Sequence, residues 1–327
     1  MEPDARARLF EMMLGFTVTQ SIGAAVRLGI PDLVSQRPRS TSKLAAAADA
    51  DPDAVHRLLR TLASLGIFTE EGGSIHHTSM SELLCSTAPA SLASHSLIFS
   101  GVHYRTWGGG LETFQTGEAA FPRVYGAPFF DWLAEHPTEG SSFNAAMAAG
   151  ATVRGARLLD RDWSGVSSVV DIGGGTGTAL IRLLTKTSGL VGTVFDLPQV
   201  RQEALAAIEA AGLTDRCSFI AGDFFTEVPS GADVFTLSNI LHDWDDESAS
   251  RILRTLRPAM TPLSKLLLLE RVVEPGNQPD EAKLLDLHML MVLGGKERSE
   301  SEWRDLLSRG GFDVTHIEAG LIEARPV

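Results

Sequence analysis

The stretch VDIGGGTGT, residues 170–178, decides the fold. It follows a β-branched apolar run and precedes TALIRLLTKT, whose apolar residues recur at helical spacing. Glycines let a backbone turn sharply and approach a ligand closely, and the first N–H groups of a helix are free to bind one. The stretch predicts a strand, a glycine turn and a helix. Its glycines are explained equally by a ligand site or by a simple tight turn.

Short apolar runs alternate with helical stretches after residue 164. The runs are VSSVVDIG, GTVFDL, CSFIAGDF, DVFTLSN and KLLLLERV. Alternation of this kind predicts an α/β fold with a doubly wound, Rossmann-like parallel sheet. Ligands of such sheets bind at the carboxyl ends of the strands, so the residues there are the candidates for function.

Acidic residues end the next two predicted strands. Asp196 follows the glycines by about twenty residues, where an acid can accept both hydroxyls of a ribose. Asp223 could meet an adenine amino group, and Phe224 could pack on the ring. Together these strand ends predict an adenosine site. Its cofactor-binding residues are Gly173, Gly175, Gly177, Asp196, Asp223 and Phe224.

The glycine loop restricts the kind of adenosine ligand. It lacks the lysine of a phosphate-binding loop, so a nucleoside triphosphate is not expected. This pattern alone does not exclude a nicotinamide dinucleotide as the ligand.

Residues 1–100 have a different texture and predict a winged-helix-like domain. Amphipathic helical stretches precede FTEEGGSIHHT, in which Gly72 and Gly73 predict a hairpin turn. Eight Lys and Arg stand against ten Asp and Glu, which is not the basic surface of a DNA reader. A dimerisation module is therefore favoured over a DNA-binding one. Its candidate interface residues are Ile22, Val26, Leu58 and Leu62.

Composition excludes other classes of protein. The net charge of −13 argues against a nucleic-acid partner, because such binding rests on cations that neutralise phosphates. Cys85 and Cys217 form no metal or disulfide spacing. The sequence has no apolar run of ~18 residues and no basic leader, so we expect no membrane span. We expect the protein in the cytoplasm. We expect residues 1–100 as the dimerisation domain and 101–327 as the catalytic domain, with 101–160 as connecting helices and substrate pocket.

Five motifs together resemble one family. VDIGGGTG, FDLP, GDFF, LHDWDDE and GGKERS occur in this order, and the resemblance covers nearly the whole chain. They resemble the plant-type small-molecule O-methyltransferases, which include caffeic acid and hydroxyindole enzymes and bacterial tailoring enzymes for aromatic natural products. The resemblance implies S-adenosyl-L-methionine as cofactor. It also implies a homodimer in which the N-terminal half contributes to the partner's substrate pocket.

The segment SNILHDWDDE, residues 238–247, carries the candidate base. The strand should end near Asn239 and a helix should begin near Asp245, which leaves His242 in the turn at the ligand edge. The acids at 245–247 then cap the helix, and no metal is predicted. An imidazole of ordinary pKa, about 6.5, can take the proton of a phenol, and the rate should fall as it protonates below about pH 6 to 7.

Other site residues follow from the resemblance. Glu270 and Glu297 match family positions where acids flank the catalytic base. Ser238 stands where many plant members have a lysine that holds the cofactor, so that contact is weaker or made elsewhere. The expected substrate contacts are Phe143, Asn144, Met147, Asp286 and Met289, and His288 is expected to line the pocket.

The sequence thus predicts an S-adenosylmethionine-dependent O-methyltransferase that acts on a phenolic hydroxyl of a polyketide-like aromatic. One alternative keeps the cofactor but methylates nitrogen, or uses it in hydroxylation or decarboxylation. The other alternative is a ligand-sensing DNA-binding regulator. The identity of the substrate and the position methylated are not specified by the sequence.

Overall fold

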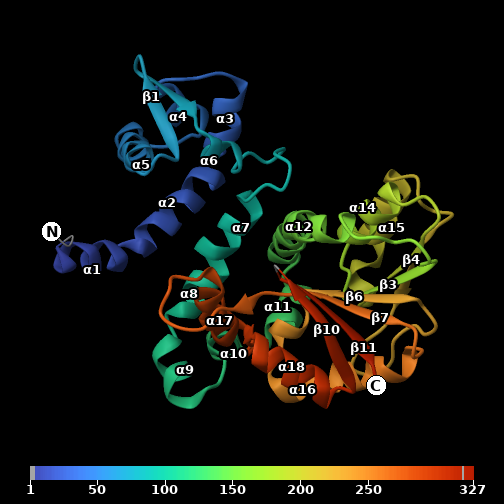
Figure 1. The fold of residues 1–327 in the computed structure, drawn as a ribbon. Helices are drawn as coiled ribbons and strands as arrows, with labels where there is room; N and C mark the ends of the chain where they lie inside the picture. The colour runs from blue at the N-terminus through green and yellow to red at the C-terminus, as the bar shows by residue number, and fades with distance from the viewer. Residues whose placement is uncertain (1–3, 319) are drawn as a thin grey trace. The chain divides into compact units, whose positions relative to one another are not determined.

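The computed structural model of the chain describes residues 4–318 and 320–327. The chain forms two compact units (Figure 1). The first comprises residues up to Arg105 together with Thr138–Ala149, and the second comprises Thr106–Pro137 and Gly150–Val327. The segment 138–149, which the sequence analysis assigned to the second domain, therefore clusters with the first unit.

The first unit is helical with a small hairpin. Its helices are α1 (Ala5–Met13), α2 (Gly15–Arg27), α3 (Ile30–Gln36), α4 (Thr41–Ala47), α5 (Pro52–Ser64), α6 (Ser79–Glu82), α7 (Ala93–Ile98) and the π-helical turn η1 (Phe99–His103). Strands β1 (Phe68–Glu71) and β2 (Ser74–His77) pair antiparallel. Gly72 and Gly73 both have positive φ, so the predicted hairpin turn is confirmed.

The core of this unit corrects one expectation about its surface. Leu44, Val55, Leu59 and Leu62 are buried in the same cluster, and Ile22, Val26 and Leu58 pack against it. Leu62 therefore lies in the core of the unit and is not an interface residue.

The N-terminal helices instead expose their large apolar side chains. None of the residues of α1 is buried, and Leu9, Phe10, Met12, Met13 and Phe16 are all exposed. Within the described ranges, one helical segment, residues 5–27, is long and apolar enough to cross a membrane by length and composition. Length and composition alone do not separate such a helix from one that packs against another protein chain.

The second unit is built on a mixed sheet. Among the described residues the strand order is β10-β11-β7-β6-β3-β4-β5. The strands are β3 (Ser168–Ile172), β4 (Val191–Asp196), β5 (Cys217–Ala221), β6 (Val234–Ser238), β7 (Lys265–Leu269), β10 (Phe312–Glu318) and β11 (Leu321–Pro326). The first five are parallel, as predicted, and β11 pairs antiparallel with β7. The hairpin of β10 and β11 at the end of the chain was not among the elements predicted from the sequence.

Helices cover both faces of the sheet (Figure 1). They are α13 (Ala156–Leu159), α14 (Thr178–Lys186), α15 (Arg201–Ala210), α16 (Asp246–Leu256), α18 (Glu300–Arg309) and the short η2 (Pro198–Val200) and η4 (Arg257–Ala259). Alternate strand residues face opposite sides: Val169 packs with α14 and α15, whereas Val170 packs with α16 and α18. The doubly wound arrangement is therefore confirmed.

Further helices precede the sheet or border its carboxyl edge. They are α8 (Tyr104–Trp107), α9 (Gly110–Thr116), α10 (Ala120–Tyr125), α11 (Phe129–Glu135), α12 (Pro137–Arg154) and α17 (Glu281–Val292). The two-residue strands β8 (Val272–Val273) and β9 (Arg298–Ser299) pair parallel. This pairing fixes the segment after α17 beside the end of β7.

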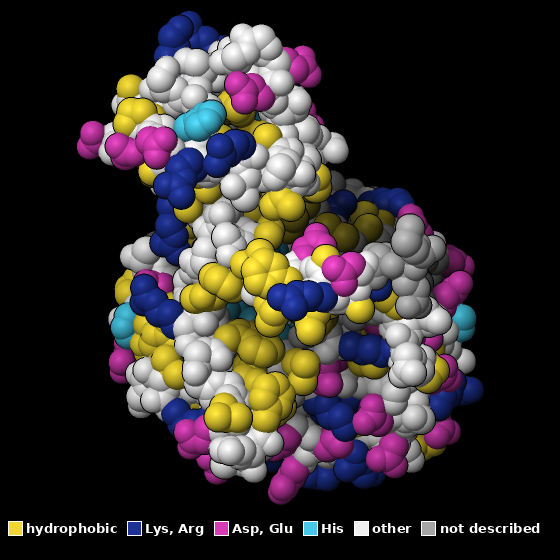
Figure 2. Space-filling model, turned by 90° about the vertical axis from the view of Figure 1, so that its left-hand side faces the viewer, with side chains coloured by type: hydrophobic (Ala, Val, Ile, Leu, Met, Phe, Trp, Pro, Cys, Tyr) yellow, Lys and Arg dark blue, Asp and Glu magenta, His cyan; other side chains and the backbone are white. Residues whose placement is uncertain are grey.

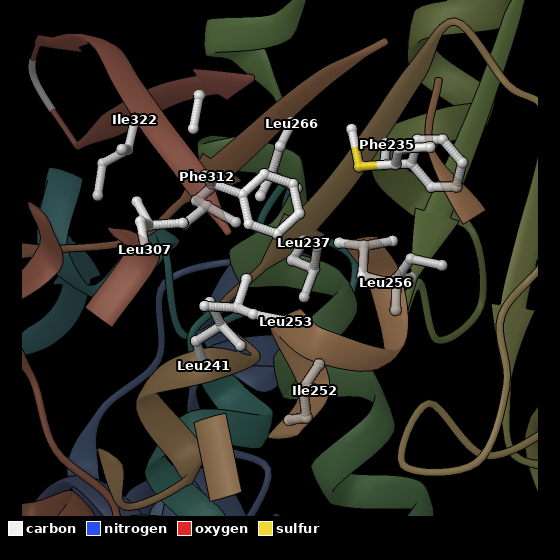
Figure 3. Packing of buried hydrophobic residues seen from close by; sticks show 14 of the residues in the cluster. Phe235, Leu237, Leu241, Ile252, Leu253, Leu256, Leu266, Leu307, Phe312 and Ile322 are labelled. Atoms are coloured by element: carbon white, nitrogen blue, oxygen red, sulfur yellow. The ribbon is translucent and has the colours of Figure 1, made fainter. Parts of the chain in front are cut away.

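Figure 3 shows the side chains of α16 packed against the sheet. Leu253 is fully buried there, and a β-carbon added at Gly310 would lie 2.6 Å from the Leu253 β-carbon. The helix is thus held tightly between the strands and the end of α18.

Replacing Leu253 with Ala should lower the stability of the second unit by about 2 to 5 kcal/mol, because the tight surroundings cannot close the cavity. Thermal unfolding followed by circular dichroism measures the loss as a lower melting temperature. Leu205→Ala, which truncates a surface leucine of α15, is the matched control and should change it little. Equal shifts for both variants would contradict this account of the core.

Candidate active site

The turn after β6 places a histidine at the carboxyl edge of the sheet. The strand ends at Ser238, Asn239 has φ 54°, and η3 (Leu241–Asp243) leads to α16. Asp245 caps that helix, since its Oδ1 accepts from Ser248 N at 2.7 Å. The predicted position of His242 and the capping role of Asp245 are confirmed.

Both ring nitrogens of His242 contact carboxylates. Nδ1 lies 2.8 Å from Glu297 Oε1, and Nε2 lies 3.2 Å from Asp243 Oδ1. Burial by itself would lower the pKa of His242, but the charges of Asp243, Glu270 and Glu297 outweigh it and raise the pKa to about 9. The ring therefore holds a proton at neutral pH, which corrects the ordinary pKa assumed from the sequence.

Asp243 was not singled out by the sequence analysis. Burial raises its pKa to about 7, although the charge of His242 works against that rise. Its position directly after the histidine was the available signal. His242 and Asp243 thus form a pair of titratable groups in this turn. The pKa of His242 is raised to about 9, and that of Asp243 to about 7.

Glu270 and Glu297 do different work. Glu297 contacts the imidazole, whereas Glu270 Oε1 accepts from the backbone N–H groups of Ile240 and Leu241 at 3.0 and 2.9 Å. Glu270 thus fixes the backbone of the turn, and burial raises its pKa. One ligand-type atom from each of His242, Glu270 and Glu297 lies within 4.8 Å of the others. The two acids therefore surround the histidine as predicted, but only one of them touches its ring.

Asp286 and Met289, both half-buried, lie on α17 next to this cluster. Asp286 Oδ1 accepts from the backbone N–H of Glu297 at 3.0 Å. The carbonyl of Met289 accepts from the N–H groups of Leu293 and Gly295. Asp286 thus holds Glu297 in place, and substrate contact by these two residues stays a prediction.

The glycine loop leaves space at the ends of β3 and β4. Gly173, Gly175 and Gly177 all have positive φ. A β-carbon at Gly173 would lie 2.5 Å from Ile240 Cδ1, and one at Gly177 would lie 2.9 Å from Val194 Cγ2. At Gly175 no atom lies within 4 Å of that place. The loop is therefore close-packed on two sides and open at its centre.

Two acids stand at the carboxyl ends of the neighbouring strands β4 and β5, and the first of them contacts the glycine loop. Asp196 accepts from the N–H groups of Gly175 and Leu197 at 2.7 and 2.6 Å. Each of its oxygens keeps a second acceptor position, which a ribose hydroxyl can use. Asp223 accepts from Phe225 N at 2.8 Å, and the Phe224 ring packs 6.2 Å from that of Trp244.

A cation that the sequence analysis missed lies beside Ser238. Arg154 Nε donates to Ser238 Oγ at 3.2 Å. Burial lowers the pKa of Arg154 to about 10, and Glu270 and Asp243 are nearby anions. Arg154 closes α12, 84 residues before Ser238, so nothing in the local sequence linked the two. A cation from another element thus lies beside Ser238, the position at which many plant members have a lysine.

These strand ends fit S-adenosylmethionine. Acceptors for a ribose, an open glycine loop, an aromatic ring and a half-buried cation suited to a carboxylate occur along one sheet edge. Phe143, Asn144 and Met147 lie half-buried on the part of α12 that belongs to the first unit. Their contact with a substrate stays a prediction.

Comparison with known proteins agrees with this geometry. Residues 109–313 match the family model of the O-methyltransferase domain, and residues 10–87 match that of the O-methyltransferase dimerisation domain. The phenazine O-methyltransferase of Lysobacter antibioticus is 40% identical, over 98% of this chain and 96% of its own. The 8-amino-8-demethylriboflavin N,N-dimethyltransferase of Streptomyces davaonensis is 34% identical, over 97% of this chain and 92% of its own.

A solved structure shows the same architecture with ligands. An O-methyltransferase from neocarzinostatin biosynthesis, in complex with S-adenosylmethionine and 2-hydroxy-5-methyl naphthoic acid, has a TM-score of 0.81. It is 31% identical, and the match covers 95% of this chain and 96% of that one. The chain therefore belongs to the S-adenosylmethionine-dependent O-methyltransferases, as its motifs predicted.

Proposed function

We propose that the protein methylates a phenolic hydroxyl of a polycyclic aromatic natural product, with His242 as the base. The observation that carries this proposal is the buried imidazole held between Glu297 and Asp243 at the carboxyl edge of the sheet. The named relatives that act on a phenazine and bind a hydroxynaphthoic acid support the substrate class.

The residues proposed to hold the cofactor lie on one edge of the sheet. Asp196 would accept from the ribose, Asp223 and Phe224 would meet the adenine, and Gly175 leaves room for close approach. The guanidinium of Arg154, oriented by Ser238, would bind the carboxylate of the methionine part. When bound, S-adenosylmethionine supplies an electrophilic methyl group and a neutral leaving group.

The protein's own chemical task is to receive a proton. A phenol has a pKa of about 10 and is a weak nucleophile at neutral pH. Because the pKa of His242 is raised to about 9, its neutral form is a stronger base than an ordinary imidazole. It must first lose the proton that it holds, and Asp243, 3.2 Å from Nε2, offers a second place for one. His242 and Asp243 together would therefore take the proton of the acceptor.

Substrate contact by residues of α17 is proposed within the second unit. Asp286 and Met289 are the candidate contacts there, and contact by Phe143, Asn144 and Met147, which belong to the first unit, stays a prediction. His288, also on α17, is buried, and burial lowers its pKa to about 4. Its Nδ1 accepts from Trp107 Nε1 at 3.2 Å, so the ring is neutral at physiological pH and serves to position its surroundings.

An amine acceptor is the second candidate, because one relative is an N,N-dimethyltransferase. A neutral aromatic amine has a free electron pair and does not need a base before it reacts. The two buried proton acceptors, His242 and Asp243, favour a hydroxyl as the methyl acceptor. The His242 variant described below distinguishes a hydroxyl acceptor from an amine acceptor.

We also propose that the working unit is a homodimer formed by the first unit. The exposed apolar face of α1 and the start of α2 would be covered by a second copy. Figure 2 shows hydrophobic side chains, in yellow, exposed on the face of the molecule that it presents. The match to a dimerisation domain over residues 10–87 supports this assignment.

Asp196→Ala should weaken the binding of S-adenosylhomocysteine about 10- to 100-fold, since a charged acceptor is worth roughly 1.5 to 3 kcal/mol. Arg154→Met should weaken it as well, because the carboxylate would lose its cation. Isothermal calorimetry measures both affinities. Asp215→Ala, at the amino end of β5, is the control, and wild-type affinity in either site variant would refute its cofactor role.

His242→Ala should reduce turnover of a phenolic substrate by at least ~10² while cofactor affinity stays near wild type. Glu270→Gln should lose less, because it keeps the shape that holds the turn. Wild-type turnover should rise with pH toward about 9, since only the neutral imidazole accepts a proton. The Ala variant should lack this rise and recover partly as the phenol ionises near pH ~10.

Turnover rates measured from pH 6 to 10 with labelled cofactor test the base, and His316→Ala, on the exposed face of β10, serves as the control. Normal turnover by His242→Ala at pH 7 would rule out the base and favour an amine or an already ionised phenol.

Sedimentation at micromolar concentration should give a dimer, since obligate interfaces commonly bury ~2,000 Å² or more. The double variant Phe10→Glu with Phe16→Glu places charges on the exposed apolar face and should sediment as a monomer. Leu205→Glu, which adds a charge to an exposed site on α15, should remain dimeric. A fully active wild-type monomer would exclude the dimer as the working unit.

A further inference from the structure

Arg298 is fully buried, a rare situation for an arginine, and lies in the segment that carries Glu297. We propose that Arg298 is a positioning residue that clamps the turn 241–246 so that Glu297 reaches the ring of His242. The inference rests on the proposed role of His242 and concerns how that histidine is held.

The guanidinium binds both ends of the turn. Its NH1 donates to the carbonyl of Leu241 at 2.9 Å, and its NH2 donates to the carbonyl of Trp244 at 2.9 Å. Nε donates to Asp246 Oδ1 at 2.9 Å, at the first residue of α16. The group therefore spans the residues on either side of His242 and Asp243.

The same guanidinium also holds its own segment. NH1 donates to the carbonyl of Lys296 at 3.2 Å, and the ring of Trp303 lies 5.2 Å from the guanidinium carbon. Glu297 stands between Lys296 and Arg298, so both of its chain neighbours are fixed against the turn. With the backbone of Glu297 fixed in this way, only the rotamer of its side chain decides whether the carboxylate reaches Nδ1 of His242.

The backbones of the two segments touch directly. Lys296 N donates to the carbonyl of His242 at 2.8 Å. A β-carbon at Gly295 would lie 2.2 Å from that same oxygen and 2.8 Å from the carbonyl oxygen of Asp243. Only glycine allows this approach, which explains why GGKER and LHDWDDE occur together.

Only an arginine can make this set of contacts. Its planar fork presents five donors in fixed directions, whereas a lysine ammonium is a compact charge on a flexible stem. Lysine at this position would keep the positive charge but could not reach Leu241, Trp244 and Asp246 at once. Arg298→Lys thus removes the geometry of the clamp while it retains the charge.

The test follows the His242 ring directly. Protein with isotope-labelled histidine is titrated by NMR, and the His242 signal is assigned by its loss in His242→Gln. In the wild type the midpoint should lie near pH 9. In Arg298→Lys it should fall toward the ordinary imidazole value of about 6.5, since the contact with Glu297 is no longer enforced. The rise in turnover between pH 7 and pH 9 should flatten in this variant, because its imidazole is already largely neutral at pH 7.

A second variant separates the two segments without changing Arg298. Gly295→Ala forces the two backbones apart without touching any charge, and it should lower the His242 midpoint in the same way. Arg309→Lys is the matched control, because Arg309 contacts the far oxygen of Asp246 at 3.7 Å from an exposed position. Its midpoint and turnover should match the wild type. S-adenosylhomocysteine affinity near wild type verifies that each variant is folded.

A wild-type His242 midpoint in both folded variants would overturn the clamp, even if turnover fell. A lowered midpoint in both, combined with full turnover by His242→Ala, would retain the clamp and refute the base instead. The NMR midpoint therefore separates the two proposals, since it does not depend on catalysis.

Discussion

The hydrogen bond between Nδ1 of His242 and Oε1 of Glu297 is the contact on which the site depends. Both groups are almost fully buried, at 6% and 2% exposed. Removing one partner of such a buried pair typically costs about 3 to 5 kcal/mol, because the other charge is left without compensation. The fold must therefore deliver both side chains accurately, and the surrounding hydrogen bonds serve that requirement.

Two separate elements meet this requirement through the backbone of one turn. Glu270, at the end of β7, accepts from two N–H groups of the turn, and Arg298 donates to two of its carbonyls. Donors and acceptors on opposite sides leave the turn little freedom. Because these groups bind main-chain atoms, they fix the position of His242 without taking up its ring nitrogens. The ring is then left to Glu297 and Asp243, which set its charge.

The sequence predicted the sheet and its ligand edge because β-branched runs, glycines and strand-end acids are local patterns. It also placed His242 in the turn, since the capping acids at 245–247 mark where α16 begins. Arg154 could not be found, because its contact with Ser238 joins residues 84 positions apart. The separate tasks of Glu270 and Glu297 depend on which oxygen faces which donor, and no spacing encodes that. The terminal hairpin was missed because β10 is mostly exposed and its apolar alternation is weak.

The charge of the cluster explains why its protonation differs from that of an isolated histidine. Asp243, Glu270 and Glu297 surround one imidazole, and Arg154 lies on the Asp243 and Glu270 side. Burial disfavours every separate charge, so the lowest free energy is reached when the anions share protons with the ring. The pKa of His242 rises while burial also raises that of Asp243, to about 7. The pKa of this imidazole therefore lies closer to that of a phenol, about 10, than the pKa of a solvent-exposed imidazole does, and its neutral form is the stronger base.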